Sequence, residues 1–100
     1  MFIVVYRWTV RDGLEDQFQR AWVTRTEEIK QEHGGLGSRL HRSAEGSWIA
    51  YAQWPSREAW QAAGTGQRAS RAREQMAAAI TSHEVLLQME VVSDLLVPTP

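Results

Sequence analysis

The chain has 100 residues, no cysteine, and 11 Lys and Arg against 12 Asp and Glu, which gives a net charge of −1. A chain of this length usually forms one domain, so we expect residues 1–100 to fold as a single unit. The lack of cysteine excludes disulfides and thiolate chemistry. The small net charge gives no general attraction to nucleic acid or to an anionic membrane. A small or neutral partner is therefore expected.

The N-terminal sequence MFIVVYRW is apolar, but no basic residues precede it and Arg7 follows within a few positions. This pattern does not fit a secretory leader. No segment approaches the roughly 18 apolar residues of a membrane-spanning helix. The expected location is cytoplasmic.

The first predicted strand is Phe2–Val10, which is rich in β-branched and aromatic residues. Because side chains alternate along a strand, it has two faces. One carries Phe2, Val4, Tyr6, Trp8 and Val10, and the other Ile3, Val5, Arg7 and Thr9. Both faces are largely apolar, so both are expected to be covered.

A helix is predicted next, because apolar residues from Leu14 to Ile29 recur at steps of three and four. Asp12 is expected to cap its start, and Gly34-Gly35 to end it. Residues Leu36–Arg42 and Ser47–Trp54 then read as two strands of a hairpin around the turn SAEG.

A second helix is predicted to start after Ser56, its expected cap, and to be interrupted by Gly64 and Gly66. A further helix is predicted for Gln67–Thr81. The last predicted strand is Val85–Val97, with Ser93-Asp94 as a bulge or bend. This strand is long for a small domain, so we expect its end to leave the sheet and cross a partner subunit.

The order strand, helix, strand, strand, helix, strand is that of the ferredoxin-like βαββαβ fold, an α+β architecture. It predicts a four-stranded antiparallel sheet with the helices on one face. A second copy of the chain is expected to cover the bare face, which makes a homodimer through the sheet face and a dimeric α+β barrel. Arg7 and Gln53 then need partners near that interface, because unpaired buried polar groups are costly.

Four local patterns carry a resemblance to a known family: the aromatic first strand leading to RDG, and the stretches HGGLGSRLHR, YAQW and SREAWQA. With the order of elements, they make the chain similar, over nearly its whole length, to the antibiotic biosynthesis monooxygenase (ABM) domain family. The resemblance implies a homodimer with a pocket in each subunit between sheet and helices. Characterised members oxygenate phenols or anthrones without metal or flavin, oxidise quinols, or degrade haem.

The haem-degrading branch of that family uses an Asn, a Trp and a His. The matching positions here are Tyr6, Ala62 or Ala63, and Arg73, and all depart from the pattern. The histidine that many other members carry shortly after EAW is also missing, with QAAGTG in its place. Haem degradation is therefore not expected.

Tyr6 and Trp8 are the first candidates for substrate binding, because they share the strand face that should point towards the helices. They could stack on a flat aromatic molecule, with the Tyr6 hydroxyl orienting it by a hydrogen bond. Core packing is the alternative for both. Trp54 and Trp60 are further candidates beside the strand-to-helix turn, where Pro55 and Trp60 could instead form a hydrophobic staple around Ser56.

The chain has three histidines, His33, His41 and His83, which show no metal-binding spacing, so no metal site is expected. His41, in the middle of the second strand, is a candidate base for a phenolic substrate, with a sheet-face or dimer-contact role as the alternative. His33 is read as a helix end and His83 as a loop residue. Arg73, with Arg57, Arg68 and Arg71, could rim the pocket or form a solvated helix face.

These observations predict a monooxygenase without a bound cofactor that acts on a small hydrophobic aromatic molecule, such as a phenol, an anthrone or a quinol. Tyr6 is the expected contact with the substrate. The alternative is a non-catalytic dimeric module of the same fold that binds a ligand or serves in stress, its pocket filled by its own tryptophans.

Overall fold

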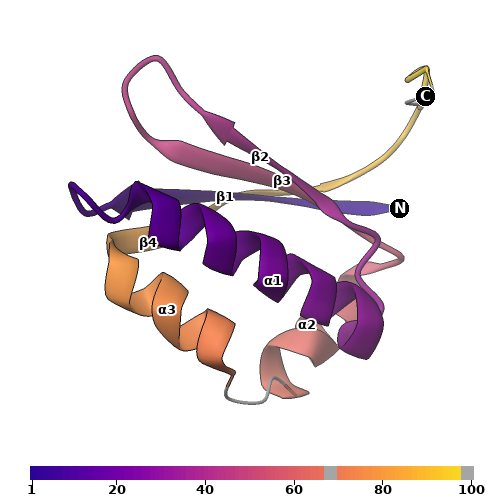
Figure 1. The fold of residues 1–100 in the computed structure, drawn as a ribbon. Coiled ribbons are helices and arrows are strands. Elements are labelled where there is room, and N and C mark those ends of the chain that lie inside the picture. The colour runs from indigo at the N-terminus through magenta and orange to yellow at the C-terminus, as the bar shows by residue number, and fades with distance from the viewer. Residues whose placement is uncertain (67–69, 98–100) are drawn as a thin grey trace.

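The structure is a computed structural model that describes residues 1–66 and 70–97. The elements of these residues are β1 (Phe2–Val10), α1 (Glu15–His33), β2 (Ser38–Arg42), β3 (Trp48–Trp54), α2 (Arg57–Gly66), α3 (Arg71–Ala79) and β4 (Ile80–Glu90). The strands form one antiparallel sheet in the order β2-β3-β1-β4. The helices lie on one face of this sheet (Figure 1). This arrangement confirms the predicted ferredoxin-like fold.

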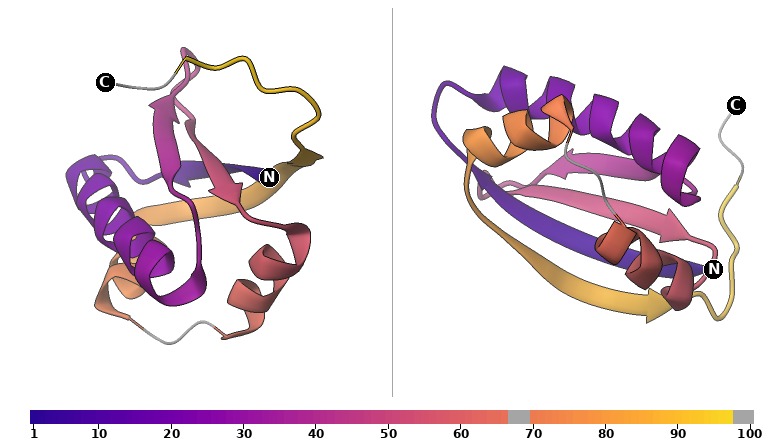
Figure 2. Two further views of the ribbon diagram at one scale, coloured as in Figure 1. Left: turned by 90° about the vertical axis from the view of Figure 1, so that its right-hand side faces the viewer. Right: turned by 90° about the horizontal axis from the view of Figure 1, so that it is seen from below.

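The central strand β1 organises the core between sheet and helices. It pairs with β3 from Phe2↔Trp54 to Trp8↔Trp48, and with β4 along its other edge. The helices cover different parts of one face of the sheet: α1 and α3 pack side by side, and α2 lies near the start of β1 (Figure 2). Two buried clusters result. One contains Phe2, Val4, Ala52, Trp54 and Ala63, and the other contains Phe18, Trp48 and Ala79.

Helix α1 starts later than its predicted cap. The N-cap position is Leu14, which makes no side-chain cap hydrogen bond, so the prediction of Asp12 as the cap is wrong. The reason is a turn between strand and helix: Gly13 has a φ of 85°, and the Leu14 N–H donates to the Arg11 carbonyl at 3.0 Å. The predicted end is confirmed, because Gly34 adopts the left-handed conformation with a φ of 75°.

The second helical region follows the prediction at its start and departs from it afterwards. The Ser56 hydroxyl accepts a hydrogen bond from the Ala59 N–H at 3.1 Å, as expected of a cap. Gly64 does not interrupt α2, which continues to Gly66, because one glycine inside a helix costs only about 1 kcal/mol relative to alanine.

Helix α3 is shorter than the predicted helix Gln67–Thr81. The predicted start at Gln67 lies outside the described residues. The Ser70 hydroxyl accepts a hydrogen bond from the Arg73 N–H at 3.0 Å and caps the helix. The helix ends at Ala79 and not at Thr81, because Ile80 already pairs with Val10 in the sheet.

The prediction of Val85–Val97 as the last strand is wrong at both ends, since β4 begins at Ile80 and ends at Glu90. Its pairing with β1 shifts register twice, between Val5 and Tyr6 and between Thr9 and Val10. The predicted bulge at Ser93-Asp94 lies beyond the strand. Residues 91–97 leave the sheet and run back past the face that the helices leave open (Figures 1 and 2).

The open face of the sheet is apolar near β4. Leu87 and Met89 lie opposite Val5 and Ile3, and they are 53% and 38% exposed. Arg7, for which we expected a partner near a dimer interface, instead forms an ion pair with Glu84 of β4 in the same chain. The open face therefore satisfies this charge by itself and presents aliphatic side chains beside it.

Candidate functional site

A cavity of about 430 Å³ lies between the sheet and the helices. This volume falls within the range of about 300–1,000 Å³ that is typical of small-molecule sites. The residues that line it from the sheet include Tyr6, Trp8, Ala50, Ala52, Trp54 and His83. Those from the helices include Trp22, Arg25, Ile29, Lys30, Arg73 and Met76. The lining is mainly aromatic and aliphatic, which suits a hydrophobic ligand.

Aromatic rings from β1 and α1 form one wall of the cavity. Tyr6 and Trp8 are alternate residues of β1 and therefore share a face of the sheet. Their rings stack, with centroids 5.6 Å apart and planes inclined by 23°, and Trp8 also packs on Phe18 at 5.4 Å. Trp22 lines the cavity from α1. A flat aromatic molecule would find ring faces of the same shape here.

The Tyr6 hydroxyl is held in place by α2. It accepts a hydrogen bond from the Trp60 Nε1–H at 2.7 Å. Burial raises the pKa of the Tyr6 phenol above its ordinary value of 10.0, and the bond from Trp60 opposes this rise. Tyr6 is therefore neutral at physiological pH, and its own O–H has no acceptor among the described residues. The site thus holds a fixed phenol that can donate a hydrogen bond to a ligand.

Comparison with known proteins identifies the family and the fold. The sequence profile described as antibiotic biosynthesis monooxygenase matches residues 1–80. The chain belongs to this family. No curated protein matches it.

Solved structures of the family share the fold of this ABM protein. A point variant of SnoaB from Streptomyces nogalater, described as a cofactor-independent oxygenase, is 18% identical with a TM-score of 0.72, and the match covers 94% of this chain and 95% of that one. The haem degrader MhuD from Mycobacterium tuberculosis, solved with two haems in its active site, is 23% identical with a TM-score of 0.69. That match covers 95% of this chain and 99% of MhuD.

The structure brings several predicted residues of the ABM protein together. Tyr6, Trp8, Trp54 and Arg73 line one cavity, and Trp60 reaches the same place through its bond to Tyr6. Trp60 also packs on Phe2, with ring centroids 5.9 Å apart. Trp48 belongs to the core and is buried against Phe18.

Other predicted residues lie elsewhere. His41 is exposed on the open face of the sheet, where its Nδ1 is 3.2 Å from the Ile49 carbonyl oxygen, and the structure does not bring it near Tyr6. It lines a separate hollow with Tyr51 and Leu96. Arg57 lies over the Phe2 ring at 5.2 Å, Arg71 is exposed, and Arg68 is outside the described residues.

Arg25 and His83 line the cavity, but the sequence pattern had singled out neither of them as a site residue. Arg25 lies on the inward stripe of α1, between Trp22 and Ile29, and a basic residue at a position of an apolar stripe was the available signal. His83 belongs to β4, opposite Trp8, and not to a loop. Its inward position depends on the register shifts of β4, for which the sequence offered no signal.

Metal-binding clusters and membrane-spanning helices are both absent from the described residues. Within residues 1–66 and 70–97, no group of three or more His, Asp or Glu side chains could hold a metal ion. No helix in that part of the chain is long and apolar enough to cross a membrane.

Proposed function

We propose that this ABM protein is a cofactor-independent monooxygenase that acts on a small hydrophobic aromatic substrate with a phenol, anthrone or quinol group. One observation carries the proposal: the cavity combines a wall of aromatic rings with a fixed, neutral hydroxyl donor at Tyr6. The rings orient a flat substrate, and the hydroxyl marks where its oxygen lies. Family membership and the fold shared with SnoaB support the same reading.

The chemistry follows from the substrate. Loss of a proton from an anthrone gives an electron-rich anion that reacts directly with molecular oxygen. The methylene carbon becomes a carbonyl carbon with one oxygen atom, and the other oxygen atom leaves as water with the two hydrogens of the methylene group. The electrons that the carbon loses are those that the oxygen gains, so no further reductant is needed.

Tyr6 contributes by stabilising the anion. Charge develops on the substrate oxygen when the proton leaves, and a preorganised hydrogen-bond donor stabilises such charge. The bond from Trp60 occupies the Tyr6 oxygen and leaves its O–H free for the substrate. The aromatic wall supplies orientation.

We assign acceptance of the proton to His83. It lines the cavity from β4, next to Trp8 in the sheet, and its side chain is exposed enough to pass the proton to solvent. Neutral imidazole is the commonest general base in enzymes. His41 takes no part in this scheme, because it lies on the other face of the sheet.

The test is titration of tryptophan fluorescence with anthrones, quinols, flavin and haem, followed by oxygen uptake for each binder. Trp8, Trp22 and Trp54 line the cavity, so a bound aromatic should quench saturably. Uptake of oxygen with an anthrone, without added metal or flavin, is the expected result. His83→Ala should slow uptake by about a hundred-fold, and His41→Ala is the matched control. Absence of saturable quenching by any of these molecules would refute the proposal.

We also propose that the protein is a homodimer through the open face of the sheet. The exposed aliphatic side chains of β4, Leu87 and Met89, support this, because exposed apolar surface of this kind marks interaction sites. Light scattering at micromolar concentration should give twice the monomer mass, and Leu87→Glu should shift the mass towards the monomer. A monomeric mass for the unchanged protein would contradict the proposal.

A further inference from the structure

Arg25 is a buried cation that its own chain does not fully satisfy. Its side chain is 7% exposed, although arginine is rarely buried unless paired. Nη1 lies 3.1 Å from Glu28 Oε1, one turn further along α1. Nη2 is buried and has no hydrogen-bond partner among the described residues. Buried guanidinium groups are normally hydrogen-bonded, so this free N–H requires an explanation.

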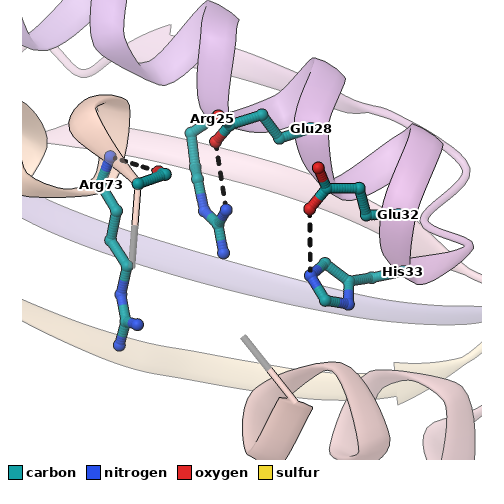
Figure 3. A network of polar contacts seen from close by, with 6 residues as sticks. Arg25, Glu28, Glu32, His33 and Arg73 are labelled. Carbon is teal, nitrogen blue, oxygen red and sulfur yellow. Dashed lines mark hydrogen bonds and ion pairs between the residues drawn. The ribbon is translucent and has the colours of Figure 1, made fainter. Parts of the chain in front are cut away.

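The side chain that carries this free N–H lines the cavity. Arg25 lines it from α1, and Figure 3 shows its side chain extending from the helix into the space above the sheet, as does that of Arg73 from α3. A second unpartnered donor, Trp54 Nε1, belongs to another residue of the same lining. Both groups donate and neither accepts. A ligand that satisfies them must therefore bring acceptor oxygens.

The charge of the lining points the same way. Lys30 and Arg73 also line the cavity, and no Asp or Glu is among the described residues that do. Arg73 has no carboxylate within ion-pair distance in the described parts of the chain, whereas Lys30 is 3.3 Å from Glu27. Glu28 offsets the charge of Arg25 but bonds to only one of its two terminal nitrogens. The cavity is thus apolar in its walls and positive in its charges.

We propose that Arg25 is an anion-binding subsite, and that the aromatic ligand of this cavity carries a carboxylate that pairs with Arg25 Nη2. This inference rests on the proposed aromatic-binding function and names its substrate class more closely. A carboxylate matches the planar fork of a guanidinium, and such pairs are about twice as strong as neutral hydrogen bonds. The second carboxylate oxygen is then available to another donor of the lining.

A purely structural role explains the site less well. An Arg–Glu pair three residues apart on a helix contributes little even on a surface, about 0.2–0.5 kcal/mol, and gains nothing from burial. The inward position of Arg25 among Trp22 and Ile29 instead replaces an apolar contact by a charge with an unmade hydrogen bond. A ligand that completes the bond accounts for this choice.

The experiment measures binding by calorimetry with an anthracene carboxylate and the matching neutral carboxamide. Wild-type protein should bind the carboxylate about ten-fold to a hundred-fold more tightly than the carboxamide. Arg25→Gln should remove this preference and leave carboxamide binding within a few-fold. Arg20→Gln is the matched control, because Arg20 lies on the same helix, is exposed, and does not line the cavity. Glu28→Gln should strengthen carboxylate binding several-fold, since it removes the competing negative charge.

Equal affinity of the wild-type protein for the two probes would overturn the proposal, as would an Arg25→Gln variant that keeps the full preference. Failure to bind either probe would overturn it too. If Arg25→Gln does not fold, the affinities of the carboxylate and the carboxamide for the wild-type protein and for Glu28→Gln still decide the question. Oxygen uptake is a separate readout. A preference for the carboxylate without oxygen uptake would contradict the proposed oxygenase function and support the Arg25 subsite. Oxygen uptake without that preference would support the oxygenase function and contradict the subsite.

Discussion

The hydrogen bond between Tyr6 and Trp60 joins the central strand to α2, and its removal tests the site geometry directly. Tyr6→Phe deletes the acceptor of the Trp60 Nε1–H, a 2.7 Å bond. A net hydrogen bond contributes about 0.5–1.5 kcal/mol, and an unpaired buried donor costs about 1–3 kcal/mol. Because both side chains are only half-buried, we expect a loss of about 1–2 kcal/mol.

The assay is thermal and denaturant unfolding followed by circular dichroism. For a domain of this size, the loss corresponds to a fall in Tm of between about 4 and 16 °C. Protein concentration must be the same for all variants, because self-association adds to apparent stability.

A double-mutant cycle separates the hydrogen bond from packing. Trp60→Phe also changes the contact of Trp60 with Phe2, at 5.9 Å between ring centroids, and the cycle of Tyr6→Phe, Trp60→Phe and the double variant subtracts this effect. The expected coupling energy is about 1 kcal/mol. A coupling below about 0.3 kcal/mol, the additivity seen for independent sites, would refute the reasoning.

Three further outcomes are expected. The unfolding free energy of the wild type should fall relative to that of Tyr6→Phe as pH rises above 10.0. The phenol of the unfolded chain ionises there, whereas burial keeps the phenol of the folded chain protonated until the pH reaches its raised pKa. Unfolding curves at alkaline pH measure this difference, and an equal pH dependence of the two proteins would contradict it. Gly35→Ala should destabilise the protein by about 1–3 kcal/mol, because a Cβ there would lie 2.8 Å from Ile29 Cγ2. Gly64→Ala meets nothing within 4 Å and should stabilise α2 by about 0.5–1 kcal/mol. Urea unfolding measures both changes; an unchanged stability of Gly35→Ala would contradict the first, and a loss of stability in Gly64→Ala the second. Ser56→Ala should cost about 1 kcal/mol in the same assay, because the Ala59 N–H loses its 3.1 Å acceptor, and Ser56→Thr should keep most of it.

The parts of the fold that the sequence predicted well are those where periodicity and glycine act together. Alternation fixed both faces of β1, and Gly34 ended α1 where only a left-handed residue fits. The junction between α3 and β4 was misplaced because it has neither glycine nor proline: Ala79 passes directly to Ile80, and only pairing with β1 decides that the helix ends there. Tertiary contacts settle such a boundary, and local propensity does not.

Only the part of the candidate site that follows from alternation along β1 could be predicted from the sequence. The shared face of Tyr6 and Trp8 follows from alternation, whereas the bond from Trp60 to the Tyr6 hydroxyl joins residues 54 positions apart and could not be read from the sequence. Arg25 interrupts the apolar stripe of α1, but a single charge on such a stripe does not by itself indicate that the side chain is buried. His41 was favoured over His83 because the sequence predicted His83 to lie in a loop and did not reveal which face of the sheet His41 occupies.

The two register shifts of β4 matter for any comparison with relatives at this level of identity. Ile80, His83 and Val85 lie opposite Val10, Trp8 and Tyr6, while Gln88 lies opposite Val4, so the inward positions change from even to odd and back to even. Thr81 and Leu86 are the two residues that this count skips. A family member that lacks either one would present a different side chain to its cavity from the same column of an ungapped alignment. Catalytic residues in this strand should therefore be transferred between members by pairing partner on β1 and not by position in the chain.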